Sequence, residues 1–428
     1  MPAGTGDAAL KLSLNDAIRL GEQFNLGILL AQSQTKAAAG ERLEQLQALL
    51  PTVDAKASMG VQQVNLKAEG INFPGINPIV GPYQVTDFRA SLAWQLLSVS
   101  SLDNYMAARH NFAAAKLSEQ DARDMVVLSV GNAYLLCAAD AARVTATEAE
   151  LKTADLSVEQ ATDAHDAGTS PRLDVLRAQV DRENVNQRLI VARNQLEKDR
   201  LALGRAIGLQ PEQEFVLTDT APFAPLESVD VEQAIATARK NRKDLQSANE
   251  QVLAAQARRK AAKDQQLPSV GFQGDFGDIG NTAAHSHGTY TATGSVSAPV
   301  LQVAKTKGDI ESTDAQLKAA EAKRDDLAAR VDQEVREALL DIASSAKLVE
   351  AAKSNVGLAG EALDEAQERF KAGVADNLAV SEAQTTDEQA NDAYIGALYQ
   401  HNMAKLSLAR AMGVAATNFS DYFGGKQP

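Results

Sequence analysis

The sequence has few of the residues on which disulfide-bonded domains and aromatic cores depend. Among 428 residues there is one cysteine, Cys137, and only 4% of the residues are aromatic. One cysteine excludes a disulfide within the chain and a paired-cysteine metal site. Because Cys137 lies among leucine and alanine, we expect a small buried side chain rather than a reactive thiol. No cofactor and no metal site are expected.

Long hydrophobic runs and excess positive charge are also missing. No run of 18 or more apolar residues occurs, so no transmembrane helix is expected. The net charge of −14, without a basic stripe, argues against nucleic-acid binding. Residues Met1–Gly4 have neither a basic region nor an apolar core, so no signal peptide is expected. If the protein is exported, we expect this to be a mature form with an added start methionine.

Catalytic motifs are not found either. There is no glycine-rich phosphate loop, and no Ser-His-Asp or Cys-His arrangement stands out. His285 and His287 lie two residues apart in a short loop without carboxylate or cysteine neighbours, which favours a plain polar loop over a metal site. An enzyme is therefore the least favoured class of function.

Proline-free segments rich in alanine and leucine predict unusually long helices. Residues 103–167 contain no proline and one glycine, with apolar residues at three- and four-residue steps. A helix of this length runs roughly 100 Å and must be covered along its side by other helices. Gly168 is expected to end it in the left-handed conformation, with Ser170 as N-cap and Pro171 opening a return helix, 171–208.

The second half of the chain repeats these features in the same order. A first helix ends at Pro51 in one half and at Pro268 in the other, followed by Thr-Val and by Ser-Val. The turn glycines Gly168 and Gly373 are followed by leucine, valine and Ala-Gln at the same spacing. Matching positions at a fixed step predict a tandem duplication.

The duplication predicts the following organisation. A flexible lead-in, 1–12, precedes a first repeat, 13–208; a linker, 209–230, joins it to a second repeat, 231–413, and a tail, 414–428, follows. Each repeat is expected to hold a first helix, a β-hairpin, a long helix and a return helix: hairpins at about 52–96 and 269–299, long helices at 103–167 and 305–371, return helices at 171–208 and 376–413.

Apolar and polar residues alternate in two runs of each repeat, a pattern typical of half-buried strands. Aromatic residues are concentrated there, as in the aromatic girdles of membrane barrels. The side chains expected to face lipid are Phe88, Leu92, Trp94, Phe272, Phe276 and Val296. Four strands cannot close a membrane barrel alone, because single-chain barrels start at eight. The chain is therefore expected to oligomerise, to eight, twelve or sixteen strands.

This pattern resembles the TolC-type outer-membrane efflux protein family, the outer membrane factors. The resemblance covers nearly the whole chain and rests on the duplication, on Leu-Pro-x-Val at Leu50 and Leu267, and on the tip sequences that begin at Gly168 and Gly373. It implies a mainly α fold with a small β part. Three chains would form a 12-stranded transmembrane β-barrel, four strands per chain, and a long coiled-coil α-helical barrel across the periplasm.

The resemblance also implies a function. Family members are passive exit ducts of tripartite efflux or type I secretion systems, and they are neither pumps nor enzymes. The implied location is the outer membrane of a Gram-negative-type bacterium. The implied partners are two further copies of the chain (a homotrimer), outer-membrane lipid, a periplasmic adaptor protein and an inner-membrane transporter, with no nucleic acid.

Two groups of site residues follow from the same resemblance. Acidic residues after the second tip glycine narrow the pore of family members, and the matching positions make Asp174 and Glu382 the pore-constriction candidates. Ala379 and Arg177 occupy the other two positions, which departs from the family pattern. The adaptor-docking candidates at the tips are Gly168, Thr169, Leu173, Gly373 and Leu378.

Simpler roles compete with these assignments. Asp174 and Glu382 could be acids that stabilise helix N-termini through the helix dipole. The tip residues could serve only the turn and the coiled coil. For the whole chain, the alternative function is a soluble periplasmic coiled-coil scaffold or adaptor. Such a scaffold needs no apolar strands flanked by aromatic residues, so these strands favour the membrane duct.

Overall fold

The computed structural model describes residues 10–68, 70–71, 74–75, 77–219, 223–224, 229–372, 374 and 377–417. The chain divides into two compact units. The first, unit 1, holds residues 1–33, 117–246 and 325–428, and the second, unit 2, holds residues 34–116 and 247–324. Each unit takes segments from both expected repeats, so the compact units do not coincide with the repeats.

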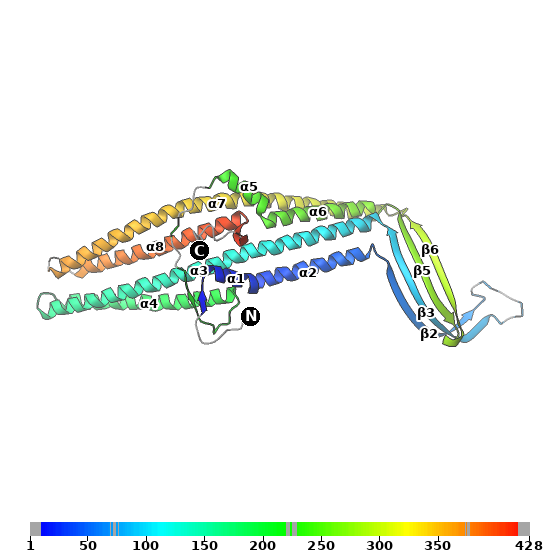
Figure 1. Cartoon of the computed structure of the whole chain (residues 1–428), viewed down its shortest axis with the longest axis horizontal. Coiled ribbons are helices and arrows are strands. Elements are labelled where there is room, and N and C mark those ends of the chain that lie inside the picture. Colours follow the sequence, from blue (N-terminus) through cyan, green and yellow to red (C-terminus); the bar gives the residue numbers. More distant parts are fainter. Residues whose placement is uncertain are drawn as a thin grey trace. The chain divides into compact units, whose positions relative to one another are not determined.

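Helices make up most of the described residues, and their lengths recur along the chain (Figure 1). Helices α1 and α5 have 11 residues each, α2 and α6 have 22, and α4 and α8 have 35. The two longest, α3 and α7, have 68 and 69 residues. Their bounds are α1 Leu14–Phe24, α2 Leu26–Gln47, α3 Val99–Asp166, α4 Arg172–Ala206, α5 Val231–Asn241, α6 Lys243–Asp264, α7 Val303–Lys371 and α8 Asn377–Ala411.

The first helix of each expected repeat is broken in two, whereas the sequence predicted one continuous helix. The breaks lie at Asn25 and Arg242, whose backbones leave the helical conformation at ψ 131° and 116°. Each break lies beside a glycine that follows a return helix, Gly208 with φ 76° and Gly413 with φ 69°. A side chain on Gly208 would collide with Phe24, and one on Gly413 with the Arg242 backbone. Tertiary packing against these glycines therefore fixes the breaks.

A two-stranded parallel sheet joins the start of the chain to the segment between the expected repeats. Strand β1, Leu10–Leu12, pairs with β4, Phe215–Leu217. Leu10–Leu12 was expected to belong to a flexible lead-in, and that expectation is wrong because its backbone is paired and Leu12 is fully buried. Residues 1–9 and 418–428 of the expected lead-in and tail lie outside the described residues.

The main apolar core of unit 1 surrounds this small sheet. The Tyr134 hydroxyl donates to the Leu12 carbonyl oxygen over 3.1 Å and accepts from the Asp219 N–H over 3.3 Å. Burial raises the pKa of Tyr134 to about 12. Cys137 is fully buried in the same core, as expected, and burial raises the pKa of its thiol to about 12. A thiol with so high a pKa is not a nucleophile at neutral pH.

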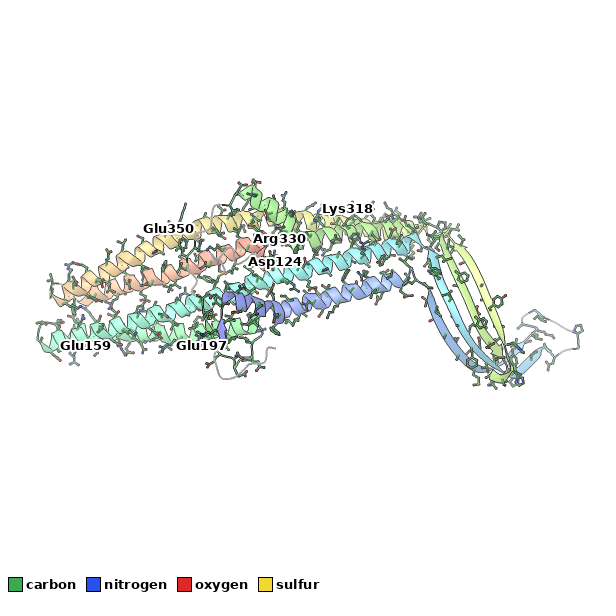
Figure 2. The ribbon with its side chains drawn as sticks, viewed as in Figure 1. Asp124, Glu159, Glu197, Lys318, Arg330 and Glu350 are labelled. Atoms are coloured by element: carbon green, nitrogen blue, oxygen red, sulfur yellow. The ribbon has the colours of Figure 1, made fainter. Side chains whose placement is uncertain are left out.

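Charged groups within unit 1 are paired where the helices pack. Asp124, labelled on α3 in Figure 2, is buried and accepts the Ala416 N–H over 2.8 Å. One turn earlier, Asp121 accepts from Arg410 over 2.7 Å. Burial raises the pKa of both carboxyls. These bonds attach the end of α8 to the middle of α3.

One described helix is apolar enough to cross a membrane by length and composition. An 18-residue window of α3 meets that test, although α3 has no unbroken run of 18 apolar residues. Half of this window is buried inside the chain. A helix that is buried in a packed bundle is also long and apolar enough to pass this test of length and composition. Packing in the core of unit 1 therefore accounts for the apolar window.

Unit 2 contains a four-stranded antiparallel sheet in the order β2-β3-β5-β6 (Figure 1). The strands are β2 Thr52–Asn65, β3 Ile79–Leu97, β5 Ser269–Gly280 and β6 Ser286–Ser297. The register places Leu92 opposite Gly274 and Trp94 opposite Phe272. Since side chains alternate between faces, most apolar residues of the four strands share one face, while Val85, Ala93 and Ile279 lie on the other. The mainly apolar face carries Phe88, Leu92, Trp94, Phe272, Phe276 and Val296.

The opposite face of the sheet is polar and carries a cross-strand ion pair. Arg89 on β3 pairs with Asp275 on β5 and donates to the Thr289 hydroxyl on β6 over 3.4 Å. Gly277 lies directly opposite both Arg89 and Thr289 in the register. A Cβ atom at Gly277 would overlap the Phe88 carbonyl oxygen. The missing side chain thus lets β3 lie close to β5.

Candidate functional site

The first hairpin tip of unit 1 is a tight turn between α3 and α4. Gly168 has φ 78°, and the Thr169 hydroxyl donates to the Ala164 carbonyl oxygen over 2.8 Å. The N-cap residue of α4 is Pro171, which makes no side-chain cap hydrogen bond. The sequence predicted Ser170 as the N-cap, so the predicted helix start is one residue too early. The Ser170 hydroxyl instead donates to Asp174 over 2.7 Å.

The two pore-constriction candidates have different surroundings. Asp174, in the first turn of α4, is only 6% exposed. Its carboxylate is held by Ser170 and lies 3.7 Å from Arg177. Glu382, near the start of α8, is exposed. An acid in the first turn of a helix is stabilised by the free N–H groups there, so Asp174 has a structural role of its own whether or not it lines a pore.

An apolar groove near the tips brings two docking candidates together. Leu173 is 53% exposed and Leu378 is 47% exposed, and both line a cavity of about 360 Å³. Gly168 and Thr169 stand in the turn and do not line this groove. Gly373 lies outside the described residues. The other lining residues are Leu176, Arg177, Val180, Asp181 and Ser381.

Further from the tips, polar side chains join α8 to the α3–α4 hairpin. The α8 side chains Gln384, Glu388 and Asp392 recur every four residues and so share one face of the helix. Together with Tyr399 they form what we call the polar seam. Its bonds are Gln384 to Ser157 at 3.0 Å, Glu388 to Arg188 at 2.7 Å, Asp392 to Arg143 at 2.7 Å and Tyr399 to Asn132 at 2.6 Å.

Two arginines of the polar seam each contact two carboxylates. Arg188 of α4 lies 2.7 Å from Glu388 and 3.4 Å from Glu150. Arg143 of α3 lies 2.7 Å from Asp392 and 2.8 Å from Asp140. Each arginine thus bridges an acid of α3 and an acid of α8. Its single positive charge is already opposed by two carboxylates.

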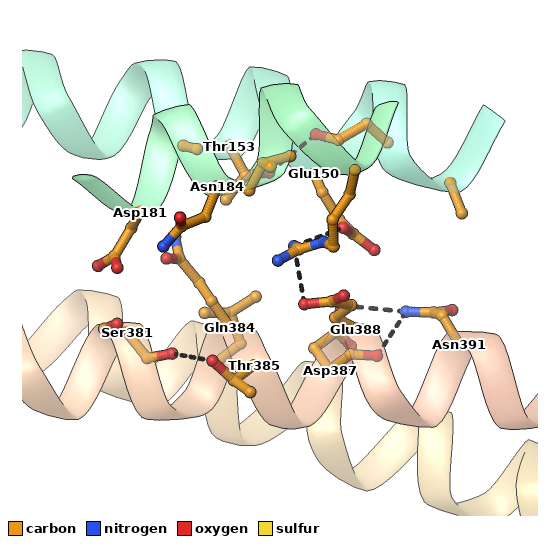
Figure 3. A pocket seen from close by; sticks show the side chains of 16 residues that line it. Glu150, Thr153, Asp181, Asn184, Ser381, Gln384, Thr385, Asp387, Glu388 and Asn391 are labelled. Carbon is orange, nitrogen blue, oxygen red and sulfur yellow. Dashed lines mark hydrogen bonds and ion pairs between the residues drawn. The ribbon is translucent and has the colours of Figure 1, made fainter. Parts of the chain in front are cut away.

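A groove runs along the polar seam (Figure 3). It consists of two cavities of about 260 and 720 Å³ that share lining residues, among them Glu150, Arg188 and Glu388. Figure 3 shows Asp181 and Asn184 on one side of the first cavity, with Gln384 and Asp387 across from them. Apolar atoms from Ala146, Val191, Ala192 and Ile395 line the second cavity.

Four carboxyl groups along the groove have raised pKa values. Burial raises the pKa of Glu150, and the nearby Glu388 carboxylate adds to this effect. Burial also raises the pKa of Asp387 and of Glu388. Burial, with the adjacent Asp199 carboxyl, raises the pKa of Asp140 to about 6. Since desolvation is the largest cause in each case, these raised pKa values report how far the groove withdraws its carboxyl groups from water.

Among the described residues, no group of three or more His, Cys, Asp or Glu side chains could hold a metal ion. His285, proposed above as part of a polar loop, shares a 3.0 Å hydrogen bond with the Thr282 hydroxyl.

The polar seam was not predicted from the sequence. Its only sequence signal is the four-residue recurrence of polar residues on α8, which does not name a partner helix.

The chain matches a known protein family over most of its length. The model of the family described as outer membrane efflux protein matches residues 24–209 and 234–414. The toluene efflux pump outer membrane protein TtgC of Pseudomonas putida is 24% identical over 376 residues, 85% of this chain and 75% of that protein. The antibiotic efflux pump outer membrane protein ArpC of Pseudomonas putida matches with the same identity and coverage.

Solved structures share the fold. The outer membrane protein VceC of Vibrio cholerae superposes with a TM-score of 0.82 at 19% identity, over 94% of this chain and 96% of that one. The MtrE outer membrane channel of Neisseria gonorrhoeae, in its open state, gives a TM-score of 0.77 at 18% identity, over 96% of this chain and 95% of that one.

Proposed function

Because the chain belongs to the outer membrane efflux protein family, we propose that it is the passive exit duct of a tripartite efflux or type I secretion system. The protein is an outer membrane efflux channel of a Gram-negative bacterium and not an enzyme, and its helical part lies in the periplasm. Passive conduction means that the chain supplies a path and that an inner-membrane transporter supplies the energy.

The sheet of unit 2 carries this proposal. Most of its apolar residues share one face and most of its polar residues the other, as lipid and water require on the two sides of a barrel wall. Strands β2 and β6 stand at the two ends of the strand order and leave edges to be paired. We infer that three copies close these edges into a 12-stranded barrel, with Phe88, Leu92, Trp94, Phe272, Phe276 and Val296 facing lipid.

The repeat organisation belongs to the same proposal. The family model matches the chain twice, and the helix lengths of the two halves recur in the same order. Both observations support a tandem duplication, with residues 13–208 and 231–413 as its copies. A trimer would then contain six copies of the repeat, which together line one duct. The family assignment also favours this duct over a soluble coiled-coil scaffold.

The hairpin tips are the proposed docking sites for a periplasmic adaptor. The groove of Leu173 and Leu378 presents exposed apolar side chains, which a helical partner would cover. Gly168, Thr169 and Gly373 complete the proposed tip surface. A cross-linker placed at residue 173 should capture an adaptor in intact cells, and one placed at the exposed Glu350 should not.

Conductance in a planar bilayer tests the duct itself. Purified protein reconstituted at low concentration should give discrete, long-lived current steps. A chain that binds lipid but never conducts would contradict the duct and would leave only an anchoring role for the sheet.

Ion selectivity tests the two pore-constriction candidates. The double variant Asp174→Asn with Glu382→Gln removes six carboxylates from a trimer while keeping side-chain size. If these acids line the narrow end, cation preference in single-channel recordings should fall, most clearly at low salt, where charges are least screened. A variant that loses thermal stability but keeps its ion preference would assign Asp174 to the helix end alone.

A further inference from the structure

The junctions between the sheet and the helices of unit 2 expose large apolar side chains. All four strands are joined to helices at the same end of the sheet, β2 to α2, β3 to α3, β5 to α6 and β6 to α7 (Figure 1). The exposed apolar residues at this end, which we call the junction collar, are Leu50, Leu97, Leu267, Val300, Leu301 and Val303. Val300 and Leu301 are 90% and 89% exposed, more than any other large hydrophobic residue of the described chain. An apolar patch of this kind marks a surface that a partner or a membrane covers.

The junction collar continues the sheet face that is proposed to contact lipid. Leu97 lies opposite Val270, which lies opposite Val296 on that face. Trp94 on the same face donates its indole N–H to the Leu49 carbonyl oxygen over 3.2 Å. Tryptophan is enriched where the hydrocarbon of a bilayer meets water. Since the helices lie in the periplasm, the junction collar stands at the periplasmic edge of the bilayer.

Basic side chains stand next to the junction collar on two helices of the second repeat. Lys263 lies in the last turn of α6, and Lys305 and Lys307 lie near the start of α7. All three are exposed. Lys307 pairs with Glu311 at 3.8 Å, but both side chains are open to solvent and such a pair contributes little. Lys263 and Lys305 form no ion pair among the described residues.

The surroundings leave these two lysines available to an external anion. The nearby acids are engaged by a different lysine, because Lys260 lies 2.9 Å from the buried Asp103 and 3.9 Å from Asp264. The first turn of α7 has no acid, so Lys305 is repelled by the positive end of the helix dipole. An anion bound beside Lys305 would offset this repulsion. Charge complementarity thus selects an anionic partner, and the apolar side chains of the collar select a lipid.

We propose that the junction collar binds anionic phospholipids of the periplasmic leaflet of the outer membrane. The inference rests on the proposed function, since it requires the apolar face of the sheet to lie in a bilayer. Val300 and Leu301 enter the region of the acyl chains, and the ammonium groups of Lys263 and Lys305 bind the headgroup phosphate. Lysine suits this position because its methylene stem packs on apolar surface while its charge reaches the headgroups.

Fluorescence of Trp94 tests the proposal. It is the only tryptophan of the chain, so quenching of its emission by brominated acyl chains reports the lipids beside the collar. The protein is reconstituted in phosphatidylcholine vesicles, in which an equal fraction of brominated phosphatidylglycerol or of brominated phosphatidylcholine replaces the host lipid. At an ionic strength of about 0.15 M, where distant charges are screened, phosphatidylglycerol should quench more strongly. We expect a binding preference of roughly fivefold for each of the two lysines.

The double variant Lys263→Gln with Lys305→Gln should remove this preference and leave quenching by brominated phosphatidylcholine unchanged. The matched control, Lys318→Gln with Lys323→Gln, removes two exposed lysines farther along α7, and Lys318 is labelled in Figure 2. Lys318 lies 13 residues beyond Lys305, roughly 20 Å along the helix axis, so the control should keep the preference. An equal loss in both double variants would overturn the proposal, because it would reduce the preference to general attraction by surface lysines.

The outcomes separate this inference from the proposed function. No quenching by brominated phosphatidylcholine would overturn the position of the sheet in the membrane. Equal quenching of the wild type by the two brominated lipids would overturn only the anionic-lipid site. Loss of the preference in an excess of soluble inorganic phosphate would indicate a site for free anions and would also overturn the proposal.

A further double variant tests the apolar part of the collar. Val300→Ser with Leu301→Ser retains every charge and should lower the preference for phosphatidylglycerol, while light scattering still gives a trimer. Loss of the trimer would assign these two residues to the contact with a second copy of the chain and would overturn the proposal.

Discussion

At the residue scale, Asp140 illustrates how burial determines what a carboxyl group contributes to stability. Its pKa of about 6 lies above the value of about 3.9 for an exposed aspartate. The folded chain therefore binds this proton more tightly than the unfolded chain does. The contribution is favourable at low pH and is lost as the pH rises from about 4 to about 6.

The variant Asp140→Asn should reveal this effect. Asparagine keeps the shape of the side chain but carries no charge at any pH. Relative to the wild type, the variant should gain stability as the pH rises from 4 to 6, by on the order of 2–3 kcal/mol, and keep that gain to pH 8. Denaturant unfolding at a series of pH values measures the difference. A variant that loses stability at pH 7.5 would show that the Arg143 bridge outweighs the burial of charge.

Residue-level expectations succeeded where neighbours in the sequence determine the environment. Cys137 was assigned to the core from its apolar flanks, and it is fully buried. Asp140 looked like any other acid on a long helix, because its burial depends on α4 and α8, far away in the sequence. Sequence periodicity gives the face of a helix but not the helix that will cover it.

At the element scale, the strands were the most predictable part of the chain. Alternation with period two gives the two faces of a strand directly, and the register then aligns those faces across the sheet. The helix breaks at Asn25 and Arg242 were not predictable in this way. Neither position carries proline, and the cause is contact with Gly208 and Gly413 at the ends of other helices.

Charge placed on the apolar face of the sheet should prevent membrane assembly. Leu92→Arg or Val296→Arg should destabilise the assembled barrel by roughly 2–4 kcal/mol if these residues lie near the bilayer midplane. The neighbouring changes Ser91→Arg and Ser295→Arg alter the polar face and should be much milder. Heat-modifiable mobility on gels after reconstitution compares them. Equal tolerance of both sets would mean that neither face meets lipid.

Two glycines of the same sheet should respond differently to alanine. A Cβ atom at Gly277 would overlap the backbone of β3, whereas nothing lies within 4 Å of one at Gly294. Gly277→Ala should therefore force β3 and β5 apart and lower the yield of folded protein, while Gly294→Ala should be nearly neutral. Refolding yield into lipid vesicles measures both, and similar yields would contradict the close approach of β3 to β5.

At the scale of the whole molecule, the proposed duct requires three chains. Light scattering with refractive-index detection, which separates protein mass from detergent mass, should give three times the chain mass of 45.4 kDa. The double variant Leu92→Arg with Val296→Arg should remain monomeric. A wild-type protein that is a monodisperse monomer in detergent would contradict both the barrel and the duct.

The pairing of β1 with β4 has a consequence for the order in which the chain can fold. The two strands are separated by more than 200 residues, and the Leu14 N–H donates a hydrogen bond to the Asp219 carboxylate, 205 residues away. A chain that crosses the inner membrane from its N-terminus arrives with β1 first. This strand then stays without its partner until half of the polypeptide has followed. Distant pairings form slowly because a long loop must close first. The nascent N-terminal segment thus presents an open strand edge during export, which is where a periplasmic chaperone would be needed most.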